Sequence, residues 1–151
     1  MDSKKLLVTT DFSDVSYAAL AYAAKMKGNQ VTLLSILQTG NVPPGLLQQM
    51  PNPNVIQEYR DKVLDQTKQK LNAVANQYFI NTGVNIDVVI CEDDIAEEIC
   101  KYAEKNAIDM IVMTGQGKGA LGSLFVGSTV QKVLRMAKIP VLVIPKAPPI
   151  T

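Results

Sequence analysis

Short apolar runs of strand type alternate with longer segments of helical periodicity along the chain, and this alternation constrains the fold more than any other feature. The strand-type runs are residues 5–9, 31–37, 85–91, 108–113 and 141–144. The helical segments between them are residues 15–26, 55–80, 95–103 and 130–137. Strands joined by right-handed helical crossovers form a parallel sheet with helices on both faces, so we predict an α/β, doubly wound, five-stranded fold.

Local signals refine this prediction. Residues 85–91 alternate between apolar and polar side chains more than the other runs, as an edge strand does. Ser13 is expected to cap the first helix, and Asp94 followed by Glu97 has the capping-box spacing at the start of the third. With 151 residues the chain is expected to be a single domain spanning 1–151, with a proline-rich loop at 39–54 and a tail at 146–151.

Composition excludes several classes of function. Fifteen basic and fourteen acidic residues leave a formal charge of +1, which gives no strong field for nucleic acid or an anionic membrane. The chain has no histidine, so hydrolase triads and histidine metal sites are ruled out, and Cys91 and Cys100 lack metal-ligand spacing. With no long apolar span and no signal peptide, we expect neither a membrane partner nor a nucleic acid partner, no metal site, and a cytoplasmic location.

Residues 108–129 carry the most specific chemical signal. An apolar strand passes into a loop with five glycines, and a helix starts at Gly127-Ser128-Thr129. Glycines allow the backbone to approach a ligand closely, and the first turn of a helix offers unpaired N–H groups at the positive end of its dipole. This order predicts an anion site, most naturally for phosphate.

Two common phosphate motifs do not fit this loop. A Walker loop needs serine or threonine after Gly-Lys, whereas Gly117-Lys118 is followed by Gly119. The dinucleotide spacing that starts at Gly115 would place its third glycine on Ala120, and it belongs after the first strand of a βαβ unit rather than late in the chain.

The loop instead resembles that of the universal stress protein family, which reads Gly-x-x-Gly, nine residues, then Gly-Ser or Gly-Thr. Gly117, the nine residues after it and Gly127-Ser128 match the second half of this pattern, and Thr114 stands at its first glycine. The similarity runs from Lys4 to Pro145 outside the proline-rich loop. It implies the adenine-nucleotide alpha-hydrolase-like fold, with strand order 3-2-1-4-5.

Ligands of such sheets bind at the carboxyl ends of the strands where the winding reverses, here between the first and fourth strands. The resemblance implies that Asp11 lines a nucleoside pocket, while Asp11 could instead form an Asx turn that starts the first helix. The predicted nucleotide-binding residues are Thr9, Thr10, Asp11, Ile36, Met113, Thr114, Gly115, Gly117, Lys118, Gly127, Ser128 and Thr129.

We interpret the chain as a nucleotide-responsive regulatory protein that binds ATP, with or without Mg²⁺, and not as an enzyme beyond slow ATP hydrolysis, because no general base near neutrality is present. The final apolar run, with Val141, Leu142, Val143 and Ile144, would aggregate if exposed at a sheet edge, so a homodimer through this strand is expected.

Two alternatives stay open. Thr114 could mark a family member that does not bind nucleotide and acts by dimerisation and protein contact. A receiver-like signalling domain has the same architecture, with Asp11, Asp93, Thr114 and Lys146 near strand ends, but receivers need paired acids where Asp11 is followed by Phe12.

Overall fold

A single parallel sheet forms the centre of the protein. The computed structural model describes residues 2–38, 45, 48, 53–80, 82–115 and 126–145. The strands are β1 (Lys5–Thr9), β2 (Gln30–Gln38), β3 (Val84–Cys91), β4 (Met110–Thr114) and β5 (Val141–Ile144). They form a five-stranded sheet in the order β3-β2-β1-β4-β5, and every neighbouring pair is parallel. The predicted class and strand order are confirmed.

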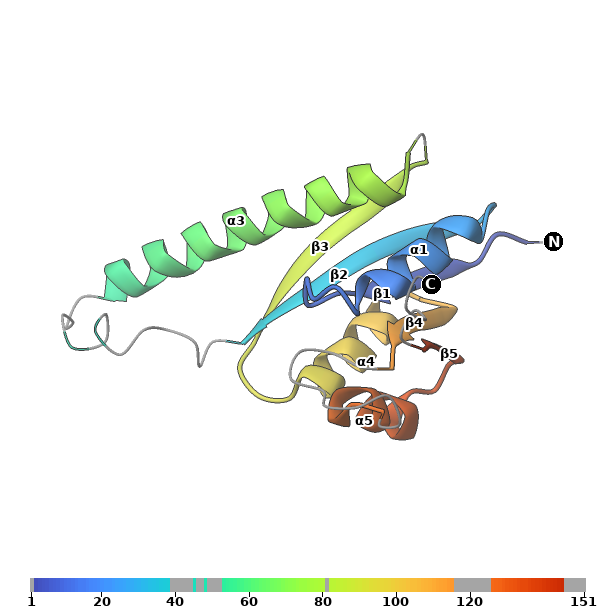
Figure 1. Cartoon of the computed structure of the whole chain (residues 1–151). Coiled ribbons are helices and arrows are strands. Elements are labelled where there is room, and N and C mark those ends of the chain that lie inside the picture. Colours follow the sequence, from blue (N-terminus) through green and yellow to red (C-terminus); the bar gives the residue numbers. More distant parts are fainter. Residues whose placement is uncertain are drawn as a thin grey trace.

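Helices cover both faces of this sheet. They are α1 (Tyr17–Lys25), α3 (Pro53–Tyr78), α4 (Ile95–Lys105) and α5 (Ser128–Met136). In Figure 1, α3 lies on one side of the sheet, and α4 and α5 lie on the other. Successive side chains of a strand point to opposite faces, so Leu6 and Val8 of β1 join the core under α1 and α3, while Leu7 joins the core under α4 and α5.

The two edges of the sheet differ in character. β3 alternates as predicted, with Val84, Ile86 and Val88 on the face covered by α3 and polar residues between them. β5 is apolar along its length, and all four of its residues are half-buried. Among the described residues, β5 is paired only with β4, at one edge of the sheet.

Two predicted helix starts are wrong. α1 begins at Tyr17, after Ser16, which makes no side-chain cap hydrogen bond. Ser13 Oγ accepts from the Ser16 N–H group at 3.3 Å, so Ser13 caps the turn that precedes α1. α3 begins at Pro53, inside the segment expected to be a loop, since proline fits the first turn of a helix, where no N–H donor is needed. Within the rest of that segment, Gly45 and Gln48 have helical conformation, and the other residues of 39–52 lie outside the described part of the chain.

The third predicted helix start is confirmed. The Asp94 side chain accepts a hydrogen bond from the N–H group of Glu97 at 3.2 Å, as a capping residue does. At the other end of α4, Ala107 has φ +52°, and the Ile108 N–H group donates to the Ala103 carbonyl at 2.9 Å. This left-handed residue ends the helix at a position where glycine is the usual choice.

Candidate functional site

The candidate site lies at the carboxyl edge of the sheet, where β1 and β4 run side by side. Val8 of β1 is in register with Val112 of β4, so the ends of both strands reach the same edge. β1 continues into α1 on one face, whereas β4 leads toward α5 on the other. The helices that follow these two strands therefore lie on opposite faces of the sheet, which is the arrangement that opens a ligand crevice in doubly wound sheets.

The turn after β1 is fixed by its own side chains. Asp11 Oδ1 accepts hydrogen bonds from the Ser13 N–H group, at 3.0 Å, and from the Ser13 hydroxyl. The Thr10 and Ser16 hydroxyl oxygens are 2.8 Å apart in a buried hydrogen bond, and the Phe12 N–H group donates to Thr10 Oγ1 at 3.1 Å. Asp11 thus forms the Asx turn that leads into α1, at the carboxyl edge of the sheet.

Phe12 is the strained residue of this turn. Its φ of +64° lies in the left-handed region that bulky residues rarely adopt. The ring packs against the core under α1 and α3, and Lys70 Nζ lies 4.9 Å from the ring centre. Packing and the cation–π contact stabilise a backbone conformation that would otherwise be unfavourable, so the turn has one defined shape.

Thr114, the last residue of β4, faces α1. Its side chain is buried, and its hydroxyl donates to the Ser16 carbonyl at 3.2 Å. Val112 lies on the same face of β4, in the core under α1 and α3. Thr114, at the first position of the glycine pattern, therefore connects β4 to the start of α1 by a hydrogen bond, on the opposite face from α5.

The two ends of the glycine loop meet beside β4. The Gly115 N–H group donates to the Ile144 carbonyl at 2.9 Å, and the Gly115 carbonyl accepts from the Gly127 N–H group at 2.7 Å. A Cβ atom at Gly115 would lie 3.3 Å from a methyl group of Val143, so β5 packs closely against this point. These contacts place the start of α5 directly at the carboxyl end of β4.

The N-cap residue of α5 provides no side-chain cap. Gly127 is the N-cap residue and has no side chain to accept from the first N–H groups of the helix. Ser128 and Thr129 follow, and the positive end of the helix dipole lies at the same place. Lys132, one turn later, bonds to Asp94 at 2.7 Å and so ties α5 to the start of α4. An anion is the natural partner for such a helix start.

The structure brings some of the predicted residues together and places others elsewhere. Thr9, Thr10 and Asp11 at the end of β1 lie opposite Thr114 and Gly115 at the end of β4, and Gly115 contacts Gly127. Ile36 lies within β2, half-buried against the core under α4 and α5, and Met113 is buried in that same core. Gly117 and Lys118 lie outside the described residues.

Metal, membrane and thiol chemistry have little support in the described part of the chain. Within it, no group of three histidine, cysteine, aspartate or glutamate side chains could hold a metal ion. Among the same residues no helix is both long and apolar enough to cross a membrane. Cys91 is buried and Cys100 is partly buried, and burial raises the pKa of the Cys100 thiol, with a further contribution from Asp94.

The hydroxyl network of Thr10, Ser16 and Thr114 was missed by sequence reasoning. Thr10 and Thr114 each end a strand, which is a signal that was available, but their common partner Ser16 is separated from Thr114 by 98 positions. The contact between Asp94 and Lys132 was missed for the same reason, since the two residues lie on different helices.

Comparison with known proteins identifies the family. A family model described as the universal stress protein family matches residues 3–145. The chain belongs to the universal stress protein family. Universal stress protein MJ0531 of Methanocaldococcus jannaschii is 30% identical over 144 residues, which cover 95% of this chain and 82% of that protein.

Solved structures of other universal stress proteins have the same fold. The structure of MJ0577, also from Methanocaldococcus jannaschii, is 25% identical with a TM-score of 0.78, covering 98% of this chain and 99% of that one. A universal stress protein from Archaeoglobus fulgidus, solved in complex with dAMP, is 17% identical with a TM-score of 0.58, covering 95% of this chain and 98% of that one. At that identity the second likeness shows the fold alone.

Proposed function

We propose that this universal stress protein binds ATP in the crevice between the ends of β1 and β4 and acts as a nucleotide-responsive regulatory protein. One observation carries the proposal: the hydrogen bond from Gly127 to Gly115 holds a helix start whose N-cap residue has no side chain at the switch point of the sheet. Such a helix start binds phosphate, and the ends of β1 and β4 supply the side walls. The dAMP complex of the Archaeoglobus relative lends support to an adenine nucleotide.

The residues divide into two groups in this proposal. Phosphate oxygens accept from the N–H groups and hydroxyls at Gly127, Ser128 and Thr129, together with Gly117 and Lys118 of the loop. The nucleoside contacts the other group, which consists of Thr9, Thr10, Asp11, Ile36, Met113, Thr114 and Gly115. Asp11 is suited to accept from a ribose hydroxyl or the adenine amino group, or to bind Mg²⁺ that accompanies ATP.

We expect binding without efficient hydrolysis. Fast phosphoryl transfer to water needs a group that orients or deprotonates the attacking water, as well as charge stabilisation. The chain has no histidine, and the Asp11 carboxylate already accepts two hydrogen bonds from Ser13 in the turn after β1. Regulation would then follow from nucleotide occupancy, because bound nucleotide stabilises the conformation that binds the nucleotide more tightly.

The test is a calorimetric titration of the nucleotide-stripped protein with ATP, with and without Mg²⁺. Gly127→Asp places a carboxylate where it caps the first N–H groups of α5, so it competes with phosphate at the same donors. Gly83→Asp adds the same charge at an exposed position with open space around it. We expect ATP to bind to the wild type and to Gly83→Asp, and to bind at least roughly tenfold more weakly to Gly127→Asp, because a charge-assisted contact is lost.

Equal ATP affinity of the two aspartate variants would overturn the proposed place of the phosphate. No heat from the wild type at millimolar ATP would overturn nucleotide binding itself. In that case the dimer surface and the segment 39–54 become the places to look for function.

We also infer that the protein is a homodimer through β5. In the part of the chain that the structure describes, no strand pairs with the outer edge of β5, and Val141, Leu142, Val143 and Ile144 are all only half-buried. A second copy related by a two-fold axis would cover both apolar edges at once. Sedimentation should show a dimer for the wild type and a monomer for Val141→Lys, while Ile80→Lys, at a residue 70% exposed, should remain dimeric. A monomeric wild type would contradict this inference.

A further inference from the structure

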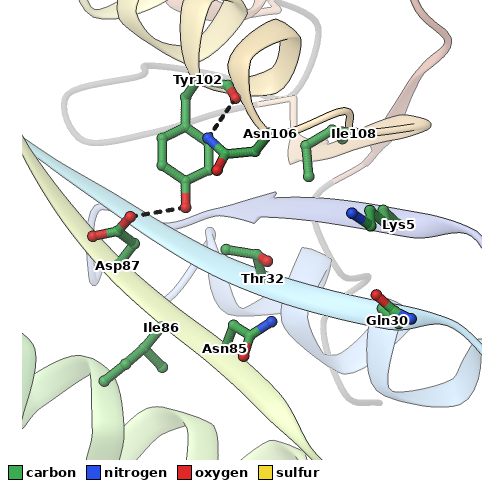
Figure 2. A pocket seen from close by; sticks show the side chains of 9 residues that line it. All are labelled: Lys5, Gln30, Thr32, Asn85, Ile86, Asp87, Tyr102, Asn106 and Ile108. Carbon is green, nitrogen blue, oxygen red and sulfur yellow. Dashed lines mark hydrogen bonds between the residues drawn. The ribbon is translucent and has the colours of Figure 1, made fainter.

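A polar pocket of about 270 Å³ lies at the opposite, amino edge of the sheet. Its floor is formed by β1, β2 and β3, and its wall by the last turn of α4 (Figure 2). The polar side chains that line it include Lys5, Gln30, Thr32, Asn85, Asp87 and Tyr102. None of these residues belongs to the proposed nucleotide crevice.

The sequence of β2 and β3 makes this face polar. Val31 and Leu33 point to the core under α3, so Thr32 between them points to the other face, and Asn85 and Asp87 of β3 do the same between Val84, Ile86 and Val88. Parallel strands in doubly wound sheets are normally apolar on both faces because helices cover both. Here polar side chains occupy positions that would otherwise be packed under a helix.

Hydrogen bonds fix the end of the pocket at Asp87. The Tyr102 hydroxyl donates to Asp87 Oδ2 at 2.9 Å, and the Val88 N–H group donates to Asp87 Oδ1 at 2.9 Å (Figure 2 shows the first). Asn106 Nδ2 donates to the Tyr102 carbonyl at 2.9 Å and completes the wall. Each carboxylate oxygen has two acceptor sites, so Asp87 can still accept hydrogen bonds from a ligand.

Charges of opposite sign lie at the two ends. Figure 2 shows Asp87 at one end, Lys5 at the other and Thr32 between them. The Lys5 N–H group donates to Asp109 Oδ2 at 2.8 Å, which holds the backbone of that end in place. Lys5 is in register with Gln30, and Asp87 with Leu34. Four residues along the strands and two strand spacings across them separate the Cα atoms of Lys5 and Asp87 by roughly 16 Å.

This separation selects the length of a ligand. Side chains of a strand stand roughly perpendicular to the sheet, so the two charged groups stay roughly 16 Å apart, and a contact of about 3 Å at each end leaves a gap of roughly 10 Å, which about three extended residues of a peptide span. A single amino acid is too short to contact both charges. The hydroxyl of Thr32 and the amide of Asn85 lie between the ends and match peptide N–H and C=O groups.

We propose that this pocket binds a short zwitterionic peptide of about three residues, with its ammonium group at Asp87 and its carboxylate at Lys5. Peptide groups in the middle contact Thr32 and Asn85. The site is independent of the proposed nucleotide function, because it uses other residues at the other edge of the sheet.

The test is an amide NMR titration of the full-length protein with trialanine. Trialanine blocked at both ends by acetyl and amide groups is the uncharged control. Glucose tests whether the pocket binds hydroxyl-bearing molecules in general. Asp87→Asn keeps an acceptor for Tyr102 but removes the charge at one end. Lys5→Met removes the other charge, and Lys4→Met is its matched control, since neighbouring side chains of the extended chain point to opposite faces.

We expect free trialanine to shift the amides of Thr32, Asn85 and Asp87, with about tenfold weaker binding to Asp87→Asn and to Lys5→Met because each loses a charge-assisted contact. Lys4→Met should bind as the wild type does. Three outcomes would overturn the proposal: no shifts at these residues at millimolar trialanine, equal shifts from the blocked peptide or glucose, or equal weakening by Lys4→Met. Thermal unfolding of each variant confirms that it is folded.

Discussion

Replacing Thr114 with valine removes one buried hydrogen bond at the candidate site and keeps the shape of the side chain. The lost bond runs from Thr114 Oγ1 to the Ser16 carbonyl at 3.2 Å. That carbonyl keeps a second partner, the Ala19 N–H group at 3.2 Å, so it is not left without a hydrogen bond. The expected loss is therefore about 1 kcal/mol, the net worth of one hydrogen bond, which lowers the unfolding midpoint by about 2–4 °C in a domain of this size.

Thr67→Val is the matched control for this change. Thr67 is also buried, and its hydroxyl donates to the Val63 carbonyl at 2.7 Å within the same helix. Such a bond to the preceding turn adds little to a helix, so this variant should lose less stability than Thr114→Val. Chemical and thermal unfolding followed by circular dichroism measure both.

Thr114→Val also tests the position of the Thr114 side chain relative to the ligand. The side chain of Thr114 points to α1, so its proposed contact with the nucleoside is made by its backbone, and Thr114→Val should bind ATP within about twofold of the wild type. Loss of ATP binding by this variant, or equal destabilisation by Thr67→Val, would refute the assigned role.

Three further predictions concern stability. Ala107→Gly should raise the unfolding free energy by about 0.5–1 kcal/mol because φ is +52° there. The control Ala73→Gly, at an exposed position of α3, should lower it by about 1 kcal/mol, and urea unfolding measures both. Lys132 lowers the pKa of Asp94 below its ordinary value of 3.8. The wild type should therefore be more stable than Lys132→Met above that pH, and the difference should disappear on acidification, as thermal unfolding in an acid series will show. Burial and Asp87 raise the pKa of Tyr102 from 10.0 to about 12. Between these two values the unfolded chain has released the tyrosine proton and the native protein has not. The wild type should therefore lose stability relative to Tyr102→Phe as the pH rises through this interval.

Each of these predictions has an outcome that contradicts it. Destabilisation by Ala107→Gly would mean that another contact of the alanine outweighs its backbone strain. A Lys132→Met difference that persists in strong acid would exclude the Asp94 carboxylate as its cause. A spectrophotometric titration in which Tyr102→Phe removes a tyrosine of ordinary pKa would contradict the raised value.

Much of the fold follows from local patterns. The strand runs are apolar and short, and the long helix repeats its apolar residues every three or four positions, so their order predicts a doubly wound sheet. The cap at Asp94 is equally local, because its partner Glu97 is three residues away. The start of α1 was misplaced because a turn, in which Ser13 Oγ accepts from the Ser16 N–H group at 3.3 Å, precedes the regular helix at Tyr17.

The candidate site is only partly visible in the sequence. The glycines and the helix start at Gly127 predict an anion site, but the contact that brings Gly127 to Gly115 depends on the position of β5 as well. The direction of the Thr114 side chain follows from strand alternation, whereas its acceptor on α1 depends on packing between segments far apart in the chain. The pocket at the amino edge is also a tertiary feature, since it requires β1, β2, β3 and α4 together.

An amide NMR titration of the isotope-labelled protein with ATP tests the proposed nucleotide site most directly. We predict the largest shifts at Gly127, Ser128 and Thr129 and in the turn that contains Asp11, with no shifts at Asn85 on the far edge of the sheet. No shifts at the start of α5 at millimolar ATP, or shifts confined to the amino edge, would contradict the proposal that this helix start and the ends of β1 and β4 form the nucleotide site.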